Sequence, residues 1–394
     1  MQRNTSWITG LKGVAAIIIF VHHFALFFYP GFIDTAAGNM RTTIGLEAKI
    51  ARTPLNIFSW GGVAGVCIFF TISGFLIAYN FYKKRTNYDI NYIIKRYFKL
   101  MIPVLLSAII IFFIIKSRIF RTDYLVKMYD IIGLRNNYSE YNSSFVSMIW
   151  ESIITLFRTS SFPTNPPMWT MKYELIYSIA SALLINVIGN HKNRYYLYPL
   201  IVLITLNSYF LCFILGIILC DLWFNHEKIL DYLNRFDFKV ILLIISLFLL
   251  SSTYLNQGTF CYSILNNLFN GIDYLVVFHS LGAAALILYF LLSEKTKKLF
   301  SKKLLLYLGK QSLYIYLFHW VILNTISMYI VLVLDKYLRY YQSSLISFVI
   351  SSVILMFSAN YFGRYISKIT NLIVSKINIL FSKNEKYKGG LLDE

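Results

Sequence analysis

The chain has 394 residues, of which 57% are apolar and only 14% are charged, whereas an ordinary soluble domain carries about 25% charged residues. A mean hydropathy of +0.60 excludes a disordered chain and an ordinary soluble domain, because a single soluble core stops growing near ~250–300 residues. The net charge of +19 would indicate nucleic-acid binding in a soluble protein, but in a membrane protein it first reports topology, so no nucleic-acid partner is expected.

Runs of roughly twenty apolar residues recur along the chain, and this is the length at which a helix crosses a bilayer. We therefore predict an all-α integral membrane protein with about ten transmembrane helices. In chain order, the predicted spans are residues 11–29, 61–82, 98–115, 168–189, 195–206, 209–224, 240–254, 271–292, 305–334 and 343–365. The fifth and sixth are short and separated only by Asn207 and Ser208, which leaves the count open by one or two. The membrane domain is expected to occupy residues 1–382, with a short tail at 383–394 that is first basic and then acidic.

Lysines and arginines in the connecting segments predict the orientation. They follow the second, fourth, sixth, eighth and last spans, so all of them face the cytoplasm if the N-terminus does and the span count is even. We therefore expect both termini to be cytoplasmic. The segment 116–167 is an exception, since it should lie outside yet holds six basic residues. Four acidic residues partly balance them, and long loops follow the rule poorly.

Ionisable residues within the predicted spans are candidate functional groups, because they are costly to bury in lipid. They include His22, His23, Glu174, His279 and His319. Counted along each helix, the last four are expected to lie at a similar depth, somewhat outside the midplane. A carboxylate beside imidazoles suits a general base or a proton relay, whereas a histidine that only stabilises helix packing is the alternative at each position. No HxxE or HExxH spacing occurs, so no metal is expected.

Five short motifs occur in order between residues 7 and 319. The first contains Gly10-Leu11-Lys12-Gly13, and ten residues separate Lys12 from His23. The other four are FFTISGFL at 69–76, KRYFKLMIP at 95–103, PMWTMKYELIY at 167–177 and LGKQSLYIYLFH at 308–319. Together they resemble the motifs of the membrane-bound acyltransferase family 3, whose GLRG opening is followed after ten residues by a catalytic histidine. Lys12 stands where the family has arginine, which keeps the positive charge but loses the planar fork of donors.

The resemblance implies an O-acyltransferase, in particular an O-acetyltransferase. Such enzymes move an acyl group from cytoplasmic acyl-CoA to a hydroxyl of an extracytoplasmic glycan or lipid-linked saccharide. Acetyl-CoA or another acyl-CoA is therefore the expected donor, and the lipid bilayer and a saccharide acceptor are the expected partners. The high content of Ile, Asn, Lys and Tyr is typical of an AT-rich genome, and we expect a bacterial protein of the cytoplasmic membrane.

The resemblance, together with the expected positions of residues in the spans, assigns roles to individual residues. His23 is expected to act as a general base or as a transient acyl carrier, and Glu174 to orient His23 or to contact the acceptor. The donor-binding candidates are Lys12, Ser73, Lys95, Arg96 and Lys99, of which the last three lie at a cytoplasmic mouth beside the second and third spans. The acceptor-binding candidates are Trp169, His279, Tyr316 and His319. For the basic residues the alternative is ordinary topology, and for Trp169 it is an anchor at the membrane interface.

Two other classes of function compete with an enzyme. A proton-coupled transporter or flippase of a saccharide-type substrate would use the same histidines and Glu174 as a proton relay. The lack of an evident internal repeat argues against it, because many secondary transporters carry one. A structural or sensory membrane protein would tolerate substitution at all of these positions together.

Overall fold

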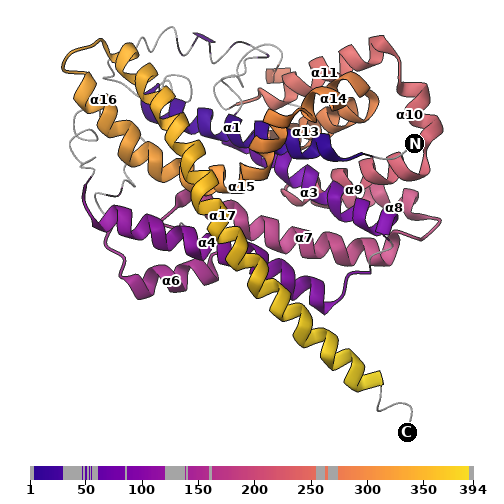
Figure 1. Ribbon diagram of the computed structural model, residues 1–394. Helices are drawn as coiled ribbons and strands as arrows, with labels where there is room; N and C mark the ends of the chain where they lie inside the picture. Colours follow the sequence, from indigo (N-terminus) through magenta and orange to yellow (C-terminus); the bar gives the residue numbers. More distant parts are fainter. Residues whose placement is uncertain are drawn as a thin grey trace.

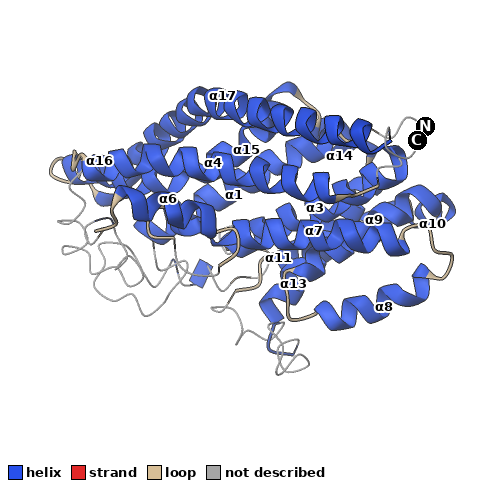
Figure 2. Ribbon diagram, turned by 90° about the horizontal axis from the view of Figure 1, so that it is seen from below, coloured by secondary structure: helices blue, strands red, loops and turns tan. Residues whose placement is uncertain are grey.

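The computed structural model describes residues 4–29, 61–84, 87–119, 141–158, 162–253, 262–264 and 274–389, together with a few single positions between 47 and 55 and Tyr138. Every regular element within these ranges is helical, which confirms the predicted all-α class. Most helices lie side by side along a common direction and form a bundle (Figures 1 and 2). Of the predicted tail at 383–394, residues up to 389 continue the last helix, but its side chains and residues 390–394 lie outside the described part.

Seven segments among the described residues are helical, apolar and long enough to cross a membrane. They are α1 (Ser6–Phe28), α3 (Gly62–Lys84), α4 (Ile90–Lys116), η5 (Pro166–Met168) with α7 (Trp169–Ile188), α13 (Tyr274–Leu292), α15 (Lys303–Ile322) with η6 (Leu323–Ser327) and α16 (Met328–Leu334), and α17 (Tyr340–Gly389). The η6 segment is a π-helical turn that directly follows the end of α15.

All ten predicted spans fall on helices, but three of these helices are short. α8 (Arg194–Thr205) and α11 (Phe236–Leu250) have 12 and 15 residues, and at ~1.5 Å per residue neither reaches across a hydrocarbon core of ~30 Å. α9 (Phe210–Asn225) is followed after a 99° bend by α10 (Glu227–Leu233), and the pair makes an eighth candidate. The predicted count of ten therefore exceeds the seven or eight found in the described ranges, because apolar composition does not reveal where turns shorten a helix.

One end of the bundle gathers the start of α1 and the ends of α3, α7 and α13. Trp7 stacks on Phe290 at 5.2 Å between ring centroids, and the Tyr82 hydroxyl donates to the Gly189 carbonyl at 3.4 Å. α17 ends on the same side (Figures 1 and 2). We call this the basic end, because the helix ends and connecting segments there carry Lys83, Lys84, Lys192, Arg194, Lys295, Lys297 and Lys298. Their common placement agrees with the expected topology, and the assignment of this end to the cytoplasm stays a prediction.

Apolar side chains cover the outer faces of the peripheral helices. Val187 of α7 is 77% exposed, Ile204 of α8 75% and Phe357 of α17 66%. Surfaces of this kind are aggregation-prone in water but match the acyl chains of a bilayer. The exposed faces therefore support a multi-pass membrane protein, in agreement with the long apolar helices.

Glycines let α1 and α15 pack backbone to backbone. A Cβ atom added to Gly309 would lie 1.8 Å from the Thr9 carbonyl oxygen, and one added to Gly13 would lie 2.6 Å from the Gly309 nitrogen. Small residues at helix crossings in membranes permit such close approach. Because both helices start at the basic end and run in the same direction, this contact between residues 296 apart sets their register. The same offset brings His23 beside His319.

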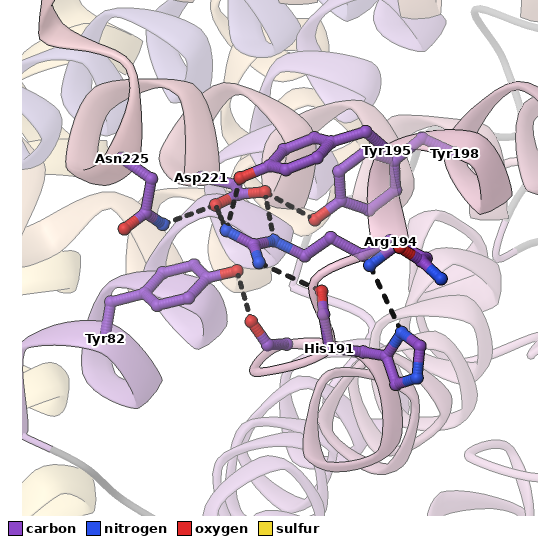
Figure 3. A network of polar contacts seen from close by, with 9 residues as sticks. Tyr82, His191, Arg194, Tyr195, Tyr198, Asp221 and Asn225 are labelled. Atoms are coloured by element: carbon purple, nitrogen blue, oxygen red, sulfur yellow. Dashed lines mark hydrogen bonds and ion pairs between the residues drawn. The ribbon is translucent and has the colours of Figure 1, made fainter.

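A buried ion pair joins α8 to α9 at the basic end (Figure 3). Arg194 donates from Nε and Nη2 to the two carboxylate oxygens of Asp221, at 2.8 and 2.9 Å. The Tyr198 hydroxyl and the Asn225 amide also donate to this carboxylate, at 2.8 and 2.5 Å. A carboxylate accepts about four hydrogen bonds, so these described partners leave it nothing to offer a ligand. We assign the cluster to holding α8 against α9.

Replacing Asp221 by alanine should lower the thermal stability of the purified protein strongly. Asp221 is 1% exposed, and its removal leaves the Arg194 guanidinium buried without its counter-ion, which costs about 3–5 kcal/mol. A thermal melt in detergent measures the effect. The control is Asp237→Ala, which breaks an ion pair with Arg235 at 3.1 Å whose side chains are 67% and 61% exposed, and exposed pairs contribute little. Equal shifts of the two variants would contradict the structural role.

Candidate active site

Two histidines from neighbouring helices form a pair deep in the bundle. His23 of α1 and His319 of α15 approach to 3.0 Å between His23 Nδ1 and His319 Nε2, and the rings lie nearly parallel with centroids 4.9 Å apart. The other ring nitrogen of His319, Nδ1, lies 2.7 Å from the carbonyl oxygen of Tyr316. Trp320 packs edge-on against His23, with 5.2 Å between the ring centroids. The ring of the preceding residue, His22, has its centroid 5.1 Å from that of His23. The packing holds the His23 ring in one orientation.

The start of the α7 segment enters the bundle at the level of Tyr316. The Tyr316 hydroxyl donates to the Pro167 carbonyl at 2.5 Å and lies 2.8 Å from the Thr170 hydroxyl. Close by, the Asn165 amide donates to the Leu317 carbonyl at 2.7 Å. The chain therefore does not begin α7 at the outer edge of the bundle but one turn inward of His319, and every later residue of α7 lies deeper still.

A cavity of about 210 Å³ lies between α1, α3, α4, α7 and α15, on the basic-end side of the histidine pair. Its polar lining comes from Lys12, Ser73, Thr170, Glu174, Ser312 and Tyr316. The remaining lining is apolar and consists of Val66, Phe69, Phe70, Leu100, Met171 and Leu313. A mostly apolar lining with a few polar groups is typical of small-molecule sites.

Glu174 is held by two partners from other helices. Arg96 of α4 forms an ion pair with it, and Ser73 of α3 donates a hydrogen bond to the same carboxylate at 2.8 Å. Arg96 also donates from Nε to Ser178 Oγ at 2.9 Å, one turn along α7 from Glu174. The charges of Arg96 and Glu174 therefore offset each other across the side of the cavity.

Lys12 is the basic side chain that lines the cavity. It is within electrostatic reach of both Glu174 and Arg96, yet no hydrogen bond or ion pair from the described residues engages its ammonium group. A buried ammonium without a partner is costly, so an anionic ligand in the cavity would stabilise the charged form of Lys12. Lys12, which stands in place of the arginine of the motif, thus keeps a basic side chain at the cavity.

Glu174 is expected from the sequence to orient His23 or to contact the acceptor, and within the described part of the chain it makes no contact with His23. Glu174 binds Arg96 and Ser73 instead, and it lies at the level of Lys12. Lys12 and His23 are eleven residues apart on α1, about 16 Å along the helix axis. The expectation that Glu174 and the histidines share one depth is therefore wrong. The cause is the inward start of α7, which counting from an assumed outer edge could not reveal.

The remaining predicted residues are spread over the bundle. His279 is 2% exposed and bonds through Nε2 to the Ser252 carbonyl at 2.9 Å, away from the cavity. Trp169 belongs to an aromatic cluster with Tyr173 and Tyr209, at centroid distances of 5.7 and 5.6 Å. Lys95 and Lys99 lie beside Arg96 on α4 but do not line the cavity. Binding roles for these four residues stay predictions.

Several residues of the site were not singled out by sequence reasoning. They are Thr170, Ser178, Ser312 and Trp320. A signal was present for two of them, since Ser178 follows Glu174 by one helical turn and Ser312 precedes Tyr316 by one turn, which places each pair on one helix face. In the described part of the chain, no group of three or more His, Cys, Asp or Glu side chains could hold a metal ion.

Comparison with known proteins adds a family assignment over nearly the whole chain. The acyltransferase 3 family model, described as an acyltransferase domain, matches residues 5–362. The match contains all the residues of the cavity and of the histidine pair. No curated protein matches the chain, and no solved structure does.

Proposed function

The chain belongs to the acyltransferase 3 family, and on that basis we propose that it is an O-acyltransferase that moves an acyl group, in particular acetyl, from acyl-CoA to a saccharide hydroxyl. The donor enters from the cytoplasm at the basic end. The acceptor is an extracytoplasmic glycan or a lipid-linked saccharide. The protein lies in the cytoplasmic membrane of a bacterium, with both termini on the cytoplasmic side.

One observation carries the proposal: Lys12 and His23 lie on the same face of α1. Eleven residues correspond to three helical turns and about 20°, so both side chains point the same way, about 16 Å apart. Lys12 faces the cavity near the basic end, and His23 lies in the histidine pair toward the opposite end. This arrangement supports a donor whose anionic part rests near Lys12 while its thioester reaches toward His23.

The chemistry requires a base at the acceptor hydroxyl. His23 takes the hydroxyl proton as the oxygen attacks the thioester carbon, the carbon–sulfur bond breaks, and the proton passes from the imidazolium to the departing thiolate. The products are an ester on the acceptor and a free thiol on the donor, which together contain all atoms of the reactants. Glu174 acts in this scheme by holding Ser73 at the cavity and Arg96 behind it rather than by touching His23.

Replacing Lys12 by methionine should raise KM for acetyl-CoA by about 10- to 100-fold, because a hydrogen bond to a charged group contributes about 1.5–3 kcal/mol. Steady-state release of free thiol by the purified protein measures this effect. Lys12→Arg is the matched control, since it keeps the charge and should keep KM within a few-fold. An unchanged KM in Lys12→Met would remove Lys12 from the donor site.

A proton-coupled transporter finds less support. A relay would need Glu174 and His23 to exchange protons, yet Glu174 is occupied by Arg96 and Ser73 at a different level of the bundle. A transporter would move saccharide into proteoliposomes with a proton-gradient dependence and without releasing thiol from acyl-CoA. Thiol release coupled to ester formation supports the transferase.

The decisive experiment compares cells with and without the gene. NMR of the surface glycans detects ester-linked acyl groups directly. We expect the ester signals to disappear on deletion and to return when the intact gene is restored. Glycans with unchanged acyl content after deletion would overturn the proposed function.

A further inference from the structure

Three groups in line fix the arrangement of protons at the histidine pair. The Tyr316 carbonyl oxygen lies 2.7 Å from His319 Nδ1, and His319 Nε2 lies 3.0 Å from His23 Nδ1. The line therefore runs from a backbone carbonyl through one imidazole into the next. Its far end is His23 Nε2, the one ring nitrogen of the two histidines that takes no part in it.

The chemistry of each group decides which nitrogen carries a hydrogen. A carbonyl oxygen can only accept, so His319 Nδ1 carries a hydrogen and donates it. A neutral imidazole has one N–H, so His319 Nε2 has a lone pair and accepts. The hydrogen in the bond between the rings must then sit on His23 Nδ1. That leaves His23 Nε2 without a hydrogen, with its lone pair available.

The surroundings favour neutral rings in the resting state. His319 is fully buried, and an unpaired imidazolium is costly at such a place. The carboxylate that lines the neighbouring cavity, Glu174, is already bound to Arg96. The order of donors also survives the reaction, because a proton added at His23 Nε2 leaves the bond from His23 Nδ1 to His319 unchanged.

We infer that His319 is a positioning residue: with the Tyr316 carbonyl it fixes the tautomer of His23, so that Nε2 of His23 is the atom that takes the proton of the acceptor hydroxyl. This inference rests on the proposed function. It gives His319 a role distinct from binding the acceptor, and it places a second imidazole where sequence reasoning expected the Glu174 carboxylate. A carboxylate or carbonyl behind a catalytic histidine serves the same purpose in hydrolases.

Two substitutions at position 319 separate positioning from packing. His319→Gln keeps a side-chain oxygen that can accept from His23 Nδ1, whereas His319→Leu fills the space and accepts nothing. We expect the Gln variant to keep kcat for thiol release within about tenfold of the parent protein and the Leu variant to lose about 100-fold or more, the scale of a general-base contribution. KM for acetyl-CoA should stay within a few-fold in both variants, because Lys12, which is proposed to hold the anionic part of the donor, lies about 16 Å from the histidine pair along α1.

A spectroscopic measurement tests the tautomer without relying on activity. ¹⁵N NMR of histidine-labelled protein distinguishes the two neutral tautomers, and the difference spectrum against His23→Ala assigns the His23 signals. We expect hydrogen on Nδ1 in the parent protein and in His319→Gln, and a mixture of tautomers in His319→Leu. A parent protein with the hydrogen on Nε2 overturns the inference even if neither variant folds.

The outcomes also separate this inference from the proposed function. If His23→Ala loses acyl transfer but the Gln and Leu variants lose it equally, with the His23 spectrum unchanged, only the positioning role of His319 fails. If His23→Ala keeps normal acyl transfer, the proposed chemistry itself fails, whatever the tautomer.

Discussion

Replacing His23 by alanine lowers acyl transfer by about 100- to 10,000-fold, the range expected for losing a general base, while the protein still inserts and folds. The loss follows from geometry, since His23 Nε2 is the end of a chain of hydrogen bonds that starts at the Tyr316 backbone. Folding persists because the tight contact of α1 with α15 is made by Gly13 and Gly309, ten residues from the histidine along α1.

Thiol release from acetyl-CoA and ester content of the glycan measure this result, and a thermal melt in detergent checks folding. The matched control is His22→Asn, which changes the neighbouring imidazole at 5.1 Å but removes no hydrogen bond of the pair. It should keep most of the activity. Normal ester content with a folded His23→Ala protein would contradict the assignment of His23 as the general base.

Replacing Gly309 by alanine should abolish folded protein or leave a small, inactive fraction. The added methyl carbon would lie 1.8 Å from the Thr9 carbonyl oxygen and 2.5 Å from its carbon, which are backbone atoms that no rotamer change can move. Overpacking usually costs about 1–3 kcal/mol, and a clash with backbone at this distance exceeds that range. Any relief by separating α1 from α15 also pulls His23 away from His319.

The yield of folded protein after extraction, followed by a thermal melt, measures this effect. Gly61→Ala is the control, because the nearest atoms to its added carbon are 3.9 Å away, an ordinary contact distance. It should extract and melt like the parent protein. A Gly309→Ala protein with parental stability and activity would contradict the close contact between the two helices.

Much of the fold follows from the sequence alone. Each predicted span overlaps a helix of the described residues, because long apolar runs leave few alternatives in a membrane. The helices α8 and α11 are nevertheless too short to cross it. The boundaries are less accurate: α4 begins at Ile90 rather than at residue 98, so Arg96 lies inside the helix, where it pairs with Glu174. Its expected place at a cytoplasmic mouth stays a prediction. The side chain of Asp89 caps α4 by accepting from the Tyr92 amide at 2.9 Å, and an aspartate at that place is a recognisable helix start.

Only part of the candidate site can be predicted from the sequence alone. Spacing pointed to His23, and the motifs pointed to Arg96, Glu174 and His319 as separate residues. Their pairing depends on two tertiary facts, the glycine contact that sets the register of α1 and α15 and the inward start of α7 at Pro167. Neither leaves a periodic trace in one sequence, because both arise between segments far apart in the chain.

The straight course of α1 along α15 determines the length that the acyl donor must span. Lys12 and His23 lie on one uninterrupted helix, which packs backbone to backbone against α15 at Gly13 and Gly309, so their separation along the axis is set by the helical rise. The carrier, not the protein, must then bridge the gap of about 16 Å. For the proposed reaction, a donor with a long flexible thiol arm can span this distance, whereas a compact donor such as acetyl phosphate is too short, whatever its reactivity.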